Sequence, residues 1–205
     1  MHKRLYLFAL LSLAILSTAF LPKTASACGY DGFYFGFGYE QLFMVTPEHQ
    51  LVAGGNGDRI SFWPSAGANA VFGYDICGTR WGVQFPIEYS RIKLNHEEWI
   101  NSIGSSMEAV FRVIAWKNGL DFHLVGGVGW SYLTEGRIND NTRSWGFNIG
   151  AGPGLTYIFS RTEKLSVGVA AEMPIRYHYY FGSHLSSNGT SAIAFPLRIS
   201  VQLGF

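Results

Sequence analysis

The last thirteen residues of the chain, 193–205, alternate between apolar side chains and polar or small ones. The apolar set is Ile193, Phe195, Leu197, Ile199, Val201, Leu203 and Phe205. A period of two indicates an extended strand with two chemically different faces. A strand of this length with one wholly apolar face is typical of a wall that has lipid on one side and a polar interior on the other. The pattern therefore favours a transmembrane β-barrel.

The beginning of the chain has the three parts of a secretory signal. Positions 2–4 are basic, residues 5–21 are almost wholly apolar, and residues 25–27 form a small-residue cleavage site. An uncleaved anchor helix is the alternative, and Pro22 together with the Ala-Ser-Ala site argues against it. We expect export and cleavage after Ala27, so that residues 1–27 are a signal peptide and residues 28–205 form the mature domain.

The composition of the mature part excludes several classes of partner. Cleavage leaves 12 basic residues against 14 acidic ones, a net charge of −2. This balance gives no reason to expect nucleic acid as a partner. The six histidines show no metal-ligand spacing, and we expect no metal and no cofactor. The 178 mature residues suit one domain, because no linker or low-complexity stretch divides them.

Eight segments of the mature chain show strand-like alternation. They are residues 32–43, 65–76, 81–91, 105–116, 120–133, 144–159, 165–181 and 193–205. The connections are alternately short and long. The short ones are residues 77–80, 117–119 and 160–164, and the long ones are residues 45–64, 92–104, 134–143 and 182–191. Short periplasmic turns, longer outer loops and an even strand count are the layout of outer-membrane barrels, whose closure leaves no unpaired edge in lipid.

Both the terminal strand and this layout resemble the small bacterial outer-membrane barrels of the OmpA/OmpX type. The resemblance implies an all-β fold, an eight-stranded antiparallel up-and-down transmembrane β-barrel, located in the cell outer membrane of a Gram-negative-type envelope. It implies a monomer whose partners are the outer-membrane lipids, including lipopolysaccharide. It also implies that the barrel assembly machinery reads the closing aromatic residue, Phe205, as an assembly signal.

Seven charged residues fall on the faces expected to point inward. They are Glu40, Glu88, Glu108, Arg112, Glu172, Arg176 and Arg198. Buried charges must be compensated, and four acids with three arginines can compensate one another. We interpret the set as a paired interior network. A charge relay or an ion path through the lumen is the alternative.

One segment deserves comparison with an active site. His184, Leu185 and Ser186 are similar to the His-x-Ser element of the outer-membrane lipid A deacylases, where the serine is the nucleophile and the histidine its base. No carboxylate follows in the last strand to orient that base. We therefore predict no catalytic residues and interpret the segment as a polar loop. Aromatic residues near the outer strand ends are expected to form an interfacial girdle.

The two cysteines, Cys28 and Cys77, both fall at the periplasmic mouth of the first predicted hairpin. Because the periplasm is oxidising, we expect a disulfide between them. Lipidation of Cys28 is the alternative, since residues 25–28 partly match a lipobox, and free thiols remain open as well.

The sequence thus predicts a barrel with a structural or surface-interaction role that is exerted through its outer loops. Two alternatives remain open. One is a narrow, porin-like passive pore for small solutes, and the other is a lipid A-modifying hydrolase. The fold does not decide among them, because it supports all three functions.

Overall fold

The computed structural model describes residues 30, 32–45, 65–76, 78–94, 98–116, 118–135, 143–181 and 190–205. The described part is all-β. The strands are β1 (Phe33–Val45), β2 (Ala66–Asp75), β3 (Trp81–Leu94), β4 (Glu98–Ala115), β5 (Leu120–Glu135), β6 (Arg143–Arg161), β7 (Ser166–Glu172), β8 (Ile175–Phe181) and β9 (Thr190–Gly204). Among these residues no helix is long and apolar enough to cross a membrane.

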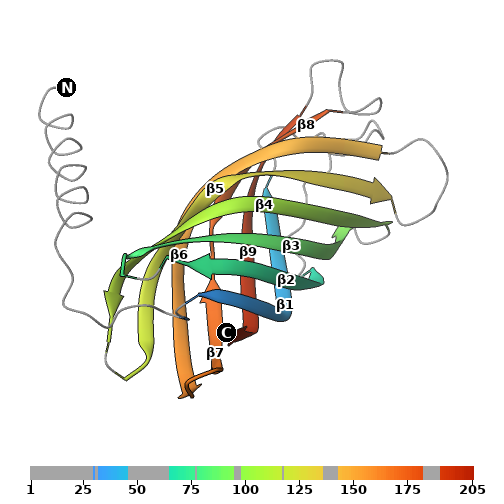
Figure 1. Cartoon of the computed structure of the whole chain (residues 1–205). Coiled ribbons are helices and arrows are strands. Elements are labelled where there is room, and N and C mark those ends of the chain that lie inside the picture. Colours follow the sequence, from blue (N-terminus) through green and yellow to red (C-terminus); the bar gives the residue numbers. More distant parts are fainter. Residues whose placement is uncertain are drawn as a thin grey trace, which may run out of the picture.

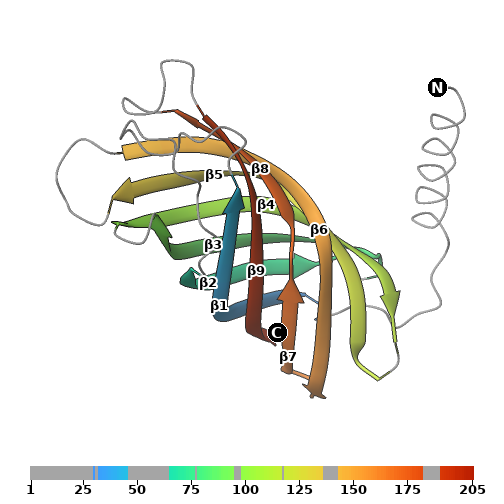
Figure 2. The same ribbon diagram turned by 180° about the vertical axis from the view of Figure 1, so that it is seen from behind.

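The strands close into a barrel. From β1 to β7 each strand pairs antiparallel with the next one in sequence, and β1 pairs with β9 from Tyr34↔Gly204 to Val45↔Ile193. Figure 1 shows the succession from β1 to β9 around the wall, and Figure 2 shows β1 and β9 side by side. Segments β7 and β8 both lie between β6 and β9 and together form one strand. The predicted eight-stranded antiparallel barrel is confirmed.

The seventh strand is interrupted at Met173 and Pro174. Proline has no N–H to donate to a ladder, so regular pairing with β6 stops at Glu172 and resumes at Ile175. The Met173 amide still donates to the Pro153 carbonyl at 3.0 Å across this gap. The wall therefore stays closed although the regular ladder has a break.

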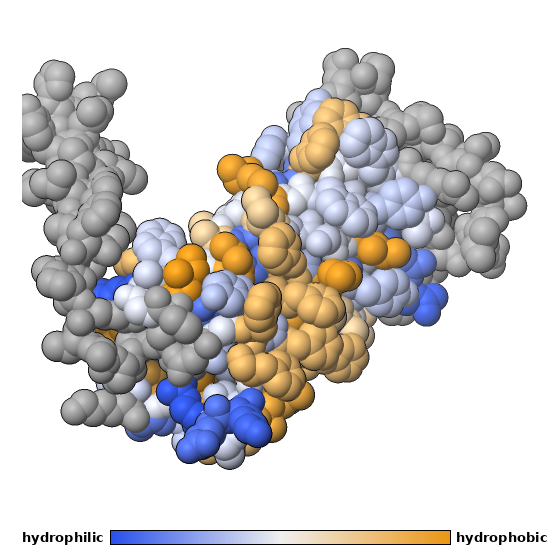
Figure 3. Space-filling model, in the orientation of Figure 1, coloured by the Kyte–Doolittle hydropathy of each residue, from blue (hydrophilic) through white to orange (hydrophobic). Residues whose placement is uncertain are grey.

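Alternation places apolar side chains outside and polar ones inside. In β1, Phe33 and Phe37 are 69% and 62% exposed, whereas Tyr34 and Glu40 are buried. Figure 3 shows apolar side chains across the middle of one face and hydrophilic ones at its lower end. A surface of exposed apolar side chains around a polar interior is the construction of a barrel that stands in lipid.

The two ends of the barrel differ in their connections. Tight turns at 76–80, 116–119 and 162–165 lie at the end that carries the C-terminus, which we call the turn end. In the second turn Gly119 has φ +87° and donates its amide to Trp116 O at 3.1 Å. The opposite end, the loop end, carries the connections 46–65, 95–97, 136–142 and 182–189.

The prediction for the second loop-end connection is wrong. Residues 92–104 were expected to form a long loop, but β3 continues to Leu94 and β4 begins at Glu98. The pairs Ile92↔Ile100 and Leu94↔Glu98 extend the hairpin beyond the predicted strand ends.

Strand β4 contains a bulge between Arg112 and Ile114 that shifts its register against β5. The bulge turns Ile114 outward and explains why polar and apolar residues alternate irregularly in this part of the strand.

Closure leads to a first prediction. Because every strand is paired on both sides, we expect the folded protein to resist detergent and to unfold only on boiling. Unboiled and boiled samples should then migrate differently on a denaturing gel, and the protein should partition into the outer-membrane fraction. Identical mobility together with a soluble periplasmic location would contradict a membrane barrel.

Candidate functional site

The barrel interior is the polar site of this molecule. All seven predicted inward charges are buried, with exposed fractions between 1% for Arg198 and 7% for Glu88. Asp75, Asp121 and His123 are also buried and join the same network. The predicted network of seven charges did not include these three residues.

Two arginines form the centre of the network. Arg198 on β9 donates to Glu108 Oε2 at 2.9 Å and lies 2.7 Å from Glu172 Oε2. Arg176 on β8 donates to Glu108 Oε1 at 2.6 Å and also to both carboxylate oxygens of Glu88. Glu88 and Arg176 come from strands on different sides of the barrel, so these pairs cross the lumen. The cross-barrel pairs hold the walls together from inside.

A second group surrounds Arg112 nearer the turn end. Its guanidinium lies 2.7 Å from Asp75 Oδ2 and 2.5 Å from Asp121 Oδ2. His123 connects this group to the central one, because its Nε2 lies 3.2 Å from Glu172 Oε1 and its Nδ1 lies 3.7 Å from Asp121 Oδ1. The network is therefore continuous along the lumen.

Glu40 differs from the other predicted members. It lies opposite Arg198 in the β1–β9 register, yet the hydrogen bond to its Oε1 comes from Ser90 at 2.7 Å. The guanidinium of Arg198 instead contacts Glu88, Glu108 and Glu172. Among the described lumen residues, the other five carboxylates share three arginines, so each guanidinium contacts two or more acids.

Inward glycines make room for the large charged side chains. A Cβ at Gly150 would stand 2.6 Å from Arg176 Cγ, and one at Gly154 would stand 2.2 Å from His123 Nε2. Glycine within a strand commonly marks such a close approach. The glycine-rich run of β6 is therefore the part of the wall against which the charges pack.

Apolar layers cover the network at both ends. Tyr30 packs on Tyr34 at the turn end, with ring centroids 5.1 Å apart, and the Tyr34 hydroxyl donates to Gln84 at 3.0 Å. At the loop end, buried side chains fill the interior. They are Leu42, Met44, Ile92, Ile100, Leu133, Tyr180, Ala192 and Ala194. Between this layer and the charges, His178 Nδ1 lies 3.1 Å from both Ser131 Oγ and Tyr180 OH. Side chains thus fill the lumen from one end to the other, as expected at eight strands.

Other predicted sites lie outside the described residues. These are the signal peptide 1–27, both cysteines of the expected disulfide, Cys28 and Cys77, and the His184 to Ser186 segment. Phe205, the predicted assembly signal, lies within the described residues. Its ring is 67% exposed, and its amide donates to Phe33 O at 2.8 Å, so it continues the closing ladder.

A closed eight-stranded barrel with a lipid-compatible exterior and a charged interior defines a membrane β-barrel of the outer-membrane type. Comparison with solved structures agrees on the fold. Neisserial surface protein A matches with a TM-score of 0.57 at 13% identity, over 85% of this chain and 97% of that one. OprG from Pseudomonas aeruginosa matches with a TM-score of 0.46 at 12% identity, covering 86% and 97% of the two chains. Ail of Yersinia pestis gives 0.45 at 13% identity, covering 84% and 99%.

No protein-family model matches the chain, and no curated protein matches it either. At such identities the structural likeness shows the fold alone. The chain has the fold of small outer-membrane barrels.

The position of Phe205 leads to a second prediction. We expect Phe205→Ser to lower the amount of folded barrel in cells and to have a much smaller effect on refolding into detergent. The substitution keeps the hydrogen bond from the Phe205 amide to Phe33 O. Burial of one rim side chain contributes only about 2 kcal/mol to the free energy of folding. Membrane levels in cells and refolded yield in vitro measure the two effects. Wild-type levels in cells would show that the terminal aromatic is incidental to assembly.

Proposed function

We propose that this protein is exported to the outer membrane and acts there as a structural or surface-interaction protein through the residues at its loop end. Export and cleavage after Ala27 belong to this proposal, as do Phe205 as the signal read by the barrel assembly machinery and a monomeric state. Outer-membrane lipids, including lipopolysaccharide, surround the barrel in this proposal.

The observation that carries the proposal is the filled lumen. Cross-barrel contacts of 2.6–3.1 Å join Arg176 and Arg198 to Glu88 and Glu108, and an apolar layer lies at each end of the charges. A solute would have to break several desolvated ion pairs and then pass both layers. Such an interior supports a role outside the lumen.

The loop end supports an external role as well. Its connections include residues 46–65 and 182–189, whereas the turn-end connections are tight. Strand β5 runs for 16 residues, and about 9–11 are enough to cross the membrane, so its last residues project beyond the lipid. Binding residues are commonly carried on loops that a rigid scaffold positions.

A conductance measurement tests the filled lumen. Purified wild-type protein in planar bilayers should give no discrete conductance steps. Reproducible steps at neutral pH would contradict the proposal and favour the narrow pore. The observation in favour of that alternative is the charged character of the lumen, which would attract ions if the network opened.

A complementation experiment tests the role of the loops. A deletion strain should become sensitive to detergent or to large antibiotics, and the wild-type gene should restore resistance. A variant in which residues 49–60 are replaced by a short Gly-Ser linker should reach the membrane and remain heat-modifiable but fail to restore resistance. Full restoration by this variant would show that the first loop does not carry the function.

The hydrolase alternative depends on His184 and Ser186, and the described residues add no support to it. Mass spectrometry of lipid A from cells with and without the protein separates the hydrolase from the proposed role, because deacylation changes the lipid A mass and a structural protein does not.

A further inference from the structure

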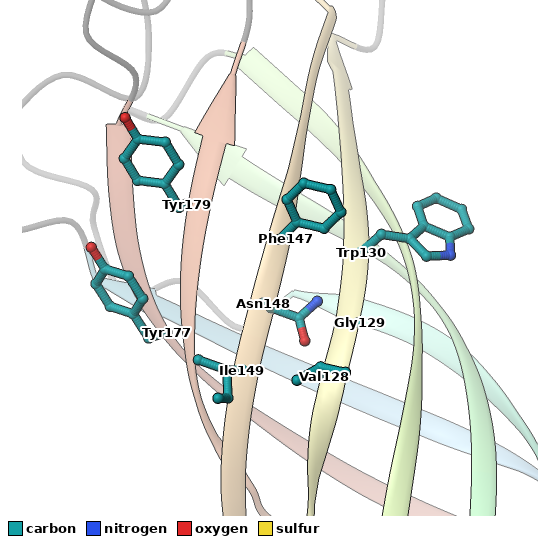
Figure 4. Close-up of a pocket in the computed structure, with 8 residues that line it drawn as sticks. All are labelled: Val128, Gly129, Trp130, Phe147, Asn148, Ile149, Tyr177 and Tyr179. Atoms are coloured by element: carbon teal, nitrogen blue, oxygen red, sulfur yellow. The ribbon is translucent and has the colours of Figure 1, made fainter.

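An open apolar groove of about 580 Å³ lies on the outer surface of the barrel, over β5, β6 and β8. Its lining residues are Val128, Gly129, Trp130, Phe147, Asn148, Ile149, Tyr177 and Tyr179. Figure 4 shows Tyr177 and Tyr179 on one side, Trp130 on the other, and Phe147, Ile149 and Val128 between them. The side chains of these six residues all point outward and are 37–60% exposed. The lining carries no charged side chain.

The strand register explains why the surface is hollow here. Trp130, Phe147 and Tyr179 form one outward row of large rings, and the next row toward the turn end is Val128, Ile149 and Tyr177. The following row places two small residues, Gly126 and Ala151, beside Ile175. The groove therefore runs along the strands from the aromatic row to the row of Val128, Ile149 and Tyr177, and the small side of the next row, Gly126 and Ala151, does not block its lower end.

The depth of the groove in the membrane follows from strand length. Trp130 is the eleventh residue of β5 counted from Leu120, and about 9–11 residues cross the hydrocarbon core. The aromatic row therefore lies at the loop-side interface, where aromatic residues are typical. Val128 and Gly126 lie below it, inside the hydrocarbon region.

Neighbouring rings make the upper margin of the groove rigid. Phe181 lies 4.9 Å from Tyr179, 5.3 Å from Trp145 and 6.1 Å from Phe147, measured between ring centroids. Aromatic pairs in this range attract one another and restrict each other's rotamers. Binding to a groove with fixed walls loses less side-chain conformational entropy than binding to a groove formed by mobile side chains.

We propose that this groove binds an acyl chain of lipid A, the lipid anchor of lipopolysaccharide. The groove is continuous with the lipid-facing surface of the barrel, begins at the interfacial aromatic row and extends toward the bilayer midplane, as an acyl chain does. Its volume lies within the usual range of small-molecule sites. With the turn end and its C-terminus on the periplasmic side, the loop end faces the outer leaflet, and lipopolysaccharide is the lipid of that leaflet. The inference rests on the proposed outer-membrane location and is independent of the proposed role of the loops.

Two matched valine substitutions test this site. Val128 in the groove and Val201 on β9 are both outward, with exposed fractions of 52% and 53%. Val128→Trp fills the groove, whereas Val201→Trp adds the same bulk to lipid-facing wall outside the lining. Each purified, heat-modifiable protein is titrated in detergent with hexa-acylated lipid A, and bound lipid is counted by native mass spectrometry. We expect at least a ten-fold loss of apparent affinity for Val128→Trp and an unchanged affinity for Val201→Trp.

Three results would overturn the proposal. Equal lipid A retention by both variants would show that the groove is not the binding site. Equally strong competition by phosphatidylethanolamine would show a general acyl site with no preference for lipid A. A wild-type dimer that only Val128→Trp dissociates would show that a second copy of the chain occupies the groove. Cell fractionation tests the proposed outer-membrane location separately from the lipid titration, so an error in the location would be recognised independently of the groove.

Discussion

Arg198→Ala is expected to lower the free energy of unfolding by about 3–5 kcal/mol, the cost of leaving buried carboxylates without their partner. Arg198 is 1% exposed and contacts Glu88, Glu108 and Glu172 at 2.7–3.1 Å. Arg176 cannot replace it, because Arg176 already pairs with Glu88 and Glu108. Urea titration of the refolded protein in detergent micelles, followed by tryptophan fluorescence, measures the loss.

The control for this substitution is Arg161→Ala at the turn end, where the side chain is exposed. An exposed arginine contributes about 0–1 kcal/mol, so the urea midpoint should change little. Arg198→Ala should also be measured in planar bilayers. Unchanged stability together with new conductance would mean that Arg198 gates a pore, and the proposed closed lumen would then be wrong.

The faces of the strands could be predicted because lipid and lumen impose opposite chemistry on alternate positions. Glu88 and Arg176 point inward, as the alternation predicted, and Phe33, Phe35 and Phe37 point outward. This reasoning needs only the period of two and the polarity of each residue. It holds wherever lipid covers the outer face.

The same reasoning fails where the strands leave the membrane. Beyond the lipid the outer face meets water and the lumen holds an apolar layer, so polarity no longer separates outside from inside. In the extension of β4, Ile100 is buried inside, whereas Asn101 points outward and receives a hydrogen bond from the Tyr89 hydroxyl at 3.0 Å. Residues 98–104 were therefore interpreted as a loop, although they continue the strand to Glu98.

The partners of the interior charges could be predicted only in part. Arg198 meets Glu172, which it faces across the β7–β9 register, so strand adjacency accounts for this pair. Strand adjacency alone would also pair Arg198 with Glu40, which it faces across the β1–β9 register, but Glu40 accepts a hydrogen bond from Ser90 instead. Long side chains reach across the lumen, as Arg176 reaches Glu88, and such contacts depend on barrel diameter and shear rather than on neighbouring strands.

Gly38→Ala is expected to abolish most of the folded barrel. A Cβ at Gly38 would stand 1.9 Å from Ile199 O and 2.5 Å from Ser200 Cα, both backbone atoms of β9. Only a separation of β1 from β9 could relieve these contacts, and this pairing closes the barrel. The loss of folding free energy should exceed the usual cost of overpacking, about 1–3 kcal/mol, because each unpaired backbone group in lipid costs several kcal/mol. The fraction of heat-modifiable protein after refolding measures the yield of folded barrel.

Gly126→Ala is the matched control, because it adds the same methyl group and removes the same backbone freedom of the unfolded chain. Gly126 faces outward on β5, and its added Cβ would meet the Ala151 Cβ at 3.2 Å, a contact that a small shift into the lipid can relieve. The control should therefore refold almost as well as wild type, whereas Gly38→Ala should not. Equal yields for the two variants would show that the β1–β9 seam tolerates separation, and that barrel closure depends on the cross-lumen charges rather than on the fit between these strands.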